Sequence, residues 1–157
     1  MAKSPRLLDA FDLAILRIVQ QDSKRPQREI AEAVNLSAAA VQRRIAAMEE
    51  AGVIAANVAL IAPDAVALPI TAIVEVQLRD ERAATVDAAK ALFCAAPEVQ
   101  QCYYVTGGIS FVLVIISPDM RAYDTLTRRL FSESDLFERF RTLVALDRVK
   151  TGMSLPI

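Results

Sequence analysis

The stretch QREIAEAVNLSAAAVQRRIAAMEEAGVI, residues 27–54, decides the fold of the first part of the chain. Apolar residues recur three and four positions apart on both sides of a short break, which predicts two helices that each bury one stripe. The stripes are Ile30, Ala31 and Val34, then Val41, Ile45 and Met48. At the break, Asn35 can adopt the left-handed conformation that ends a helix, and Ser37 can cap the next helix. The segment therefore predicts a helix-turn-helix.

The second helix of this pair leaves a face of small and polar side chains outside the core, as a helix that enters the major groove of DNA requires. Gln42 can pair with adenine, and Arg43 can pair with guanine or a phosphate. The helix would first meet the groove at Ser37, Ala38 and Ala39. An alanine-rich helical hairpin with a solvated arginine face is the plain alternative.

Other cations of this region have different expected roles. Lys24, Arg25 and Arg28 flank the first helix of the pair and suit contacts to the phosphate backbone, to which Lys3 and Arg6 could add. Arg44 lies near the edge of the buried stripe. It is expected to pair with an acidic residue of its own domain rather than with a base.

The flanking sequence completes a domain around the pair. An amphipathic helix precedes it, marked by Leu8, Phe11, Ile15, Leu16 and Val19, with Asp9 and Asp12 near its positive N-terminal end. Gly52 ends the second helix of the pair, and Val53 and Ile54 open an extended segment. This order predicts a winged helix-turn-helix.

Composition narrows the functional classes. The chain has no histidine, which removes imidazole acid–base catalysis and imidazole metal sites. Cys94 and Cys102 lack metal-ligand spacing and are expected to be buried and reduced. No apolar run is long enough to span a bilayer, and no signal segment is visible. The sequence thus predicts a cytoplasmic protein that needs no cofactor or metal and is not an enzyme.

The low net charge of the DNA-binding half indicates that the protein must assemble to bind DNA well. Residues 1–60 hold 8 Lys/Arg against 7 Asp/Glu, and residues 61–157 hold 10 against 12. A nearly neutral DNA-binding half releases few counterions per protomer, so useful affinity needs a dimer or a larger assembly.

The second half alternates between strand and helix patterns. Strands are expected at 70–79, 98–106, 111–116 and 137–148, and helices at 82–95 and 119–131. This β-α-β-β-α-β order is the ferredoxin-like module, whose uncovered apolar sheet face predicts dimerisation. The fold class is α+β: a winged helix-turn-helix at 1–55, an extended linker at 56–69, and a ferredoxin-like domain at 70–157 for effector binding and oligomerisation.

This combination resembles the Lrp/AsnC family of transcription regulators over nearly the whole chain. The matching residues are Leu8-Asp9, Phe11-Asp12, Ile15-Leu16, Glu29-Ile30-Ala31, Val34, Leu36-Ser37, Val41, Arg43-Arg44-Ile45, Glu49, Gly52-Val53-Ile54, Val105-Thr106-Gly107 and Pro118-Asp119-Met120. The resemblance implies a sequence-specific regulator that binds double-stranded DNA. It also implies a homodimer built through the ferredoxin-like sheets, higher homo-oligomers, and a small effector, commonly an amino acid, bound between subunits.

The implied effector site falls on Thr106, Gly107, Gly108 and Ser110. Many family members carry acidic residues at the positions of Gly108 and Ser110, and both carboxylates are missing here. The Gly-Gly turn still exposes backbone N–H groups that can hold a carboxylate. A changed ligand, an empty pocket and a plain β-hairpin turn all remain open.

Two rival functions are set against this one. Haem-biosynthesis decarboxylases have a similar architecture, but that resemblance implies active-site histidines, which this chain lacks. A ligand-sensing or protein-interaction module that has lost DNA binding fits the near-neutral first half. It would be recognised by a DNA shift that survives Arg43→Ala unchanged.

Overall fold

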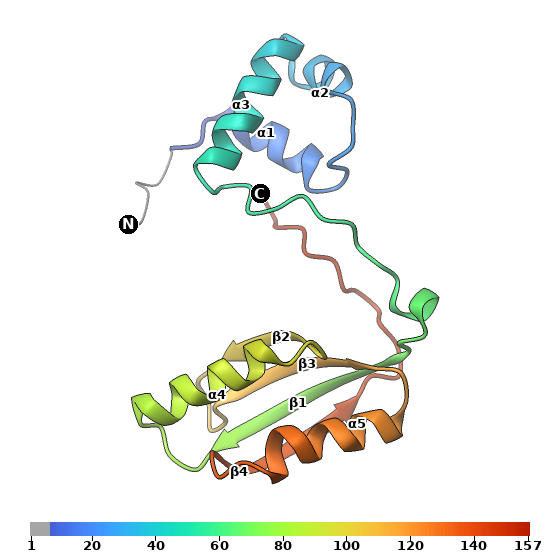
Figure 1. Cartoon of the computed structure of the whole chain (residues 1–157). Coiled ribbons are helices and arrows are strands. Elements are labelled where there is room, and N and C mark those ends of the chain that lie inside the picture. Colours follow the sequence, from blue (N-terminus) through green and yellow to red (C-terminus); the bar gives the residue numbers. More distant parts are fainter. Residues whose placement is uncertain (1–6) are drawn as a thin grey trace. The chain divides into compact units, whose positions relative to one another are not determined.

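The computed structural model describes residues 7–157, so Lys3 and Arg6 lie outside the described residues. The chain forms two compact units (Figure 1). The helical unit runs up to Leu60 and also contains Lys150–Ile157, and the sheet unit is Ile61–Val149. Residues 150–157, expected within the domain at 70–157, thus belong to the helical unit, and residues 61–69 of the expected linker belong to the sheet unit.

The helical unit contains α1 (Ala10–Val19), α2 (Gln27–Val34) and α3 (Ala38–Glu50). Asp9 and Asp12 form a capping box that starts α1. Asn35 ends α2 with φ of 54°, in the left-handed region, and the Ser37 hydroxyl accepts a hydrogen bond from the Ala40 N–H at 3.2 Å. The predicted turn chemistry is confirmed.

One apolar cluster holds the three helices together. Its buried members are Ile15, Leu16, Ile30, Ala31, Val34, Val41 and Met48. After α3 the chain is extended, but residues 53–60 pair with no strand. The N–H groups of Val53 and Ile54 instead donate to the Met48 carbonyl, at 2.9 and 3.3 Å, and close the end of α3. The segment expected as a wing is therefore extended chain without a β-ladder.

The C-terminal residues pack against α1. The Gln20 side-chain amide donates to the Leu155 carbonyl at 3.0 Å and accepts from the Leu155 N–H at 2.9 Å. Arg17 donates to the Ile157 carbonyl at 2.7 Å. These bonds account for the return of the chain to the helical unit.

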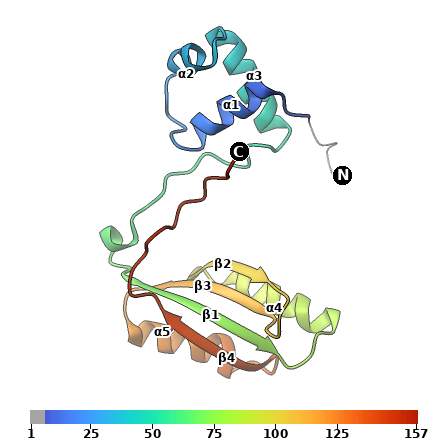
Figure 2. The ribbon, with the colours of Figure 1, turned by 180° about the vertical axis from the view of Figure 1, so that it is seen from behind.

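The sheet unit is the expected ferredoxin-like module. Its strands are β1 (Ile70–Leu78), β2 (Val99–Tyr104), β3 (Phe111–Ser117) and β4 (Phe137–Val144), in the order β2-β3-β1-β4, with every neighbouring pair antiparallel. Both α4 (Ala83–Ala95) and α5 (Met120–Thr127) cover one face, and Figure 2 shows the sheet from the other side. A short 3-10 turn, Pro63–Val66, precedes β1.

Alternation along the strands separates the two faces of the sheet. Ala72, Val74 and Val76 are fully buried beneath the helices. Phe93 of α4 packs with Phe111 at 5.3 Å and with Phe137 at 5.5 Å between ring centroids. Aromatic pairs at this spacing are attractive beyond their burial. The core thus lies between the sheet and its two helices.

Two predicted elements end earlier than expected. The strand expected to residue 148 ends at Val144, because Arg148 turns back to bind the Thr71 hydroxyl at 2.6 Å and the carbonyls of Leu68 and Pro69. The α-helix expected to residue 131 ends at Thr127 and continues as a π-helical turn, Arg128–Ser132.

The expected burial of both cysteines is wrong for Cys94, which is exposed, while Cys102 is half-buried. The buried stripe of α4 consists of Val86, Ala89 and Phe93, so the residue after Phe93 points away from the core. None of the helices in the described part of the chain is long and apolar enough to cross a membrane.

Candidate functional site

Helix α3 is locked onto α1 by Arg44. One guanidinium nitrogen of Arg44 lies 2.8 Å from Asp9 and 2.8 Å from Asp12, whose side chain is only 2% exposed. The Asp12 N–H and the Arg44 guanidinium hold the pKa of Asp9 below its ordinary value, and the bonds to Asp12 and Asp9 raise the pKa of Arg44. The guanidinium also lies 5.5 Å from the Phe11 ring centroid. The expected pairing of Arg44 within its own domain is confirmed.

The opposite face of α3 is exposed and carries an arginine that donates to no acceptor among the described residues. Its exposed residues are Ala38, Ala39, Gln42, Arg43 and Ala46. Of the arginines that the structure describes in the helical unit, Arg43 is the one that donates to no protein acceptor: Arg17, Arg25, Arg28 and Arg44 all have one. Ser37 is also exposed, and its capping bond uses the oxygen as acceptor, so the hydroxyl proton can still be donated.

The flanking cations lie on the surface of the same unit. Arg25 pairs with Glu29 at 3.3 Å and Arg28 with Glu32 at 3.2 Å, both one helical turn apart. Exposed pairs of this kind are weak, so an incoming phosphate can compete for either arginine. Lys24 is exposed as well.

The candidate effector loop joins β2 to β3. Thr106, Gly107 and Gly108 are exposed, and the two glycines have φ of 112° and 91°, which L side chains rarely adopt. Ser110 is different, because it is 2% exposed. Its hydroxyl oxygen accepts a hydrogen bond from the Leu78 N–H at 3.0 Å, and its hydroxyl proton is donated to an acidic residue of the same unit.

That residue is Glu81, in the connection between β1 and α4. One carboxylate oxygen accepts from Ser110 at 2.5 Å, and the other accepts from the Tyr104 hydroxyl at 2.8 Å. The bond to Glu81 raises the pKa of Tyr104, and burial of the phenol adds to it. No sequence pattern points to Glu81, because its partners stand 23 and 29 residues away, beyond any local spacing. A carboxylate is thus held beside the loop that lacks its own.

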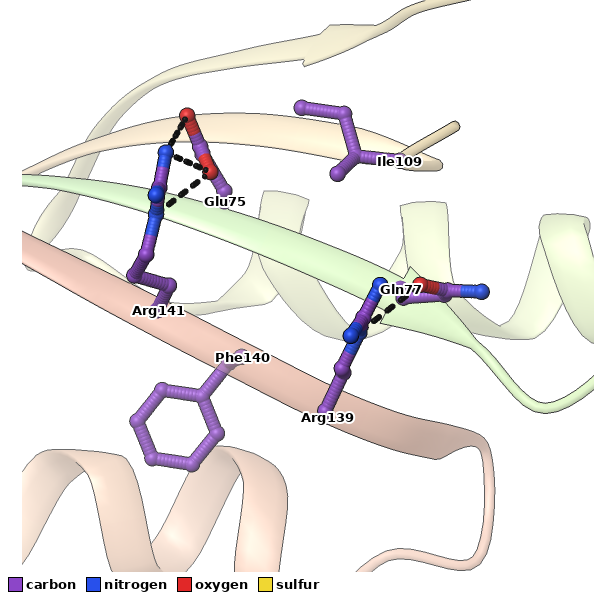
Figure 3. A pocket seen from close by; sticks show the side chains of 6 residues that line it. All are labelled: Glu75, Gln77, Ile109, Arg139, Phe140 and Arg141. Atoms are coloured by element: carbon purple, nitrogen blue, oxygen red, sulfur yellow. Dashed lines mark hydrogen bonds and ion pairs between the residues drawn. The ribbon is translucent and has the colours of Figure 1, made fainter. Parts of the chain in front are cut away.

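The open face of the sheet carries two polar rungs between β1 and β4 (Figure 3). Arg141 binds Glu75 through two nitrogens, at 2.9 Å each, and this raises the pKa of Arg141. Arg139 donates to the Gln77 side-chain oxygen at 2.9 Å. The rungs, Ile109 of the effector loop and Phe140 line a pocket of about 400 Å³. In the sequence, Arg139 and Arg141 stand two residues apart, a spacing that is typical of the solvent face of a strand and predicts no function.

Comparison with known families divides the chain in the same way. Residues 8–55 match a winged helix-turn-helix DNA-binding family, and residues 71–155 match the Lrp/AsnC ligand binding domain. An uncharacterized HTH-type transcriptional regulator of Sinorhizobium fredii, y4tD, is 41% identical over 150 residues, which cover 96% of this chain and 89% of that protein.

Two solved structures are similar over nearly the full length. The crystal structure of an AsnC family transcriptional regulator from Agrobacterium tumefaciens has a TM-score of 0.89 at 30% identity, covering 95% of this chain and 97% of its own. The complex of the Neisseria meningitidis transcriptional regulator NMB0573 with L-Met also has a TM-score of 0.89, at 27% identity, covering 96% and 97%.

Proposed function

The chain belongs to the Lrp/AsnC family and is a DNA-binding transcriptional regulator, and we propose that α3 recognises its operators through Gln42 and Arg43. The observation that carries this proposal is the free guanidinium of Arg43 on the exposed face of α3, in a unit whose other described arginines are engaged. An unpaired exposed arginine loses no internal bond when it binds a base or a phosphate.

The remaining contacts follow from position on the same unit. The first turn of α3 presents Ser37, Ala38 and Ala39, where a free hydroxyl, a helix N-terminus and two small side chains allow close approach to the DNA backbone. Lys24, Arg25 and Arg28 would exchange solvent or weak ion pairs for phosphates. We also propose that the protein works in the cytoplasm, where it meets the chromosome.

We propose a homodimer joined through the open sheet face, with higher assemblies built from dimers. That face places Ile73 of β1 between Val114 and Leu143, and Ile73 and Leu143 remain 37% and 46% exposed. Apolar side chains in register on an uncovered sheet favour association with an identical surface. Two DNA-binding units per dimer would also make up for the weak charge of each one.

The proposed effector is an amino acid bound between subunits at the loop Thr106–Ser110. The Neisseria relative was solved with L-Met. In this chain the open Gly107-Gly108 turn offers backbone N–H groups, and Glu81 offers a carboxylate for an ammonium group. Glu81 would therefore replace the acidic residues absent from the loop, with Ser110 holding it in place.

The DNA proposal is tested by fluorescence anisotropy on double-stranded DNA from upstream of the protein's own gene, at two salt concentrations. Arg43→Ala should weaken binding about 10-fold or more, the discrimination of one bidentate arginine–base pair. If Arg43 contacts phosphate instead, the slope of log affinity against log salt should fall by about 1 per protomer. Arg121→Ala, at an exposed position of α5, is the matched control.

The outcomes separate the rival functions. Unchanged affinity in Arg43→Ala would contradict the assignment of α3 as the recognition helix. Wild-type protein that binds no DNA at either salt concentration would instead favour the ligand-sensing or interaction module.

A further inference from the structure

The pocket on the open sheet face has an unbalanced charge. Of its four polar lining residues, Glu75 and Arg141 neutralise each other through two hydrogen bonds. Arg139 has a neutral partner, the Gln77 side-chain oxygen, and this bond uses its Nε. Both terminal nitrogens of Arg139 stay without an acceptor among residues 7–157. The pocket therefore holds one uncompensated positive charge and two terminal NH2 groups whose N–H donors are unused.

The two rungs leave room for a small anion. Arg139 and Arg141 stand two residues apart on β4 and pair across to Gln77 and Glu75 of β1. Two residues of a strand rise about 7 Å, which separates the two guanidinium groups by more than their thickness. Figure 3 shows the rungs side by side, with Ile109 beyond the β1 end of each. The volume of about 400 Å³ is in the range of pockets that hold small ligands.

In the proposed dimer, the positive charge of Arg139 would be removed from water. Ile73, Val114 and Leu143 form the next row on the same sheet face, beside the Glu75–Arg141 rung, and give it apolar surface that a second copy would cover. A guanidinium taken out of water without a counter-charge is strongly unfavourable. Arg139 then needs an anion in the assembled protein, and a carboxylate matches the spacing of its two terminal nitrogens.

We propose that this pocket binds the α-carboxylate of the amino-acid effector, with Arg139 as its principal ligand. The inference rests on the proposed function and extends it, because Ile109 joins the pocket to the effector loop. Ser110, next in the chain, holds Glu81. The ammonium group and side chain of the same amino acid would then lie towards the effector loop, on the side of Ile109.

The test is isothermal titration calorimetry of the full chain with each of the standard L-amino acids. The tightest ligand is then compared with its own carboxamide, which removes the negative charge and keeps the ammonium group and side chain. Wild type should bind the acid about 10- to 100-fold more tightly than the amide, as expected for a charge-assisted hydrogen bond. Arg139→Gln should weaken the acid by a similar factor and abolish the preference over the amide.

Two further variants support the comparison. Arg139→Lys keeps the charge but not the planar fork, and should retain part of the preference for the acid. Arg121→Gln makes the same arginine-to-glutamine change on exposed α5 and should bind like wild type. Sedimentation velocity on each protein shows whether the assembly is intact.

Three results would overturn the inference. Equal affinity of wild type for acid and amide would show that the carboxylate is not recognised. An acid preference that persists in Arg139→Gln, with or without a weakened dimer, would show that Arg139 contacts the second copy or only Gln77. Absence of binding by every amino acid would refute the pocket, while Arg43-dependent DNA binding would leave the DNA-binding part of the proposed function standing.

Discussion

Met48→Ala would show whether the helical unit depends on its own core. Met48 is fully buried among the seven buried residues of that core. Truncation of such a side chain to alanine costs about 2–5 kcal/mol, and the higher helix propensity of alanine returns only a few tenths. A unit of about 60 residues is stable by about 3–9 kcal/mol at typical values per residue. The variant should therefore lose a large part of this unit's stability.

The two units can be followed separately in one urea titration. The chain has no tryptophan, and its 3 tyrosines, Tyr103, Tyr104 and Tyr123, all lie in the sheet unit. Tyrosine fluorescence reports unfolding of the sheet unit, whereas far-UV circular dichroism also reports α1, α2 and α3. Met48→Ala should move the dichroism transition to lower urea and leave the fluorescence transition in place.

Gln42→Ala is the matched control, because Gln42 lies on the exposed face of the same helix. It should leave both transitions unchanged and weaken DNA binding. If Met48→Ala shifts the two transitions together, the units unfold as one cooperative body and the stability estimate for a separate helical core is refuted. No shift at all would contradict the packing of Met48.

Three other results are expected. The pKa of Asp9 is lowered in the folded protein, so its contribution to the free energy of unfolding is present above the ordinary value of 3.8 and is lost as the pH falls through the folded value. In urea titrations at several pH values, Arg44→Gln should make the unfolding midpoint fall less steeply with acid. An unchanged pH profile would count against the ion pair. Ser37→Ala should destabilise the helical unit by about 1 kcal/mol in the dichroism transition, and an unaltered midpoint would exclude the cap. Glu81→Gln should lower the Tyr104 pKa towards its ordinary 10.0 in an alkaline absorbance titration. An unchanged pKa would contradict the hydrogen bond between Glu81 and Tyr104.

The helix-turn-helix could be predicted because its signals are local. Helical period, the left-handed Asn35 and the capping Ser37 act within a few residues of one another. The strand and helix patterns of the second half likewise predicted the order of elements in the sheet unit. The same local signals failed at β4, which ends at Val144 because Arg148 binds groups 77 to 80 residues earlier in the chain.

The candidate sites divide along the same line. The exposed face of α3 follows from helical period alone, so Gln42 and Arg43 could be named from the sequence. The sequence also indicated that Arg44 pairs inside its domain, but the partners Asp9 and Asp12 lie 35 and 32 residues away and required the fold. Glu81 had no sequence signal at all.

Arg139 and Arg141 show the difference most clearly. In the sequence they are equivalent: two arginines at period two, on one face of one strand. Cross-strand register places Arg141 opposite the Glu75 carboxylate and Arg139 opposite the neutral Gln77 amide. Side-chain alternation is a property of the strand itself, so the sequence determined which face they share. Charge balance depends on partners 62 and 66 residues away, and only the tertiary structure decided which arginine lacks a counter-charge.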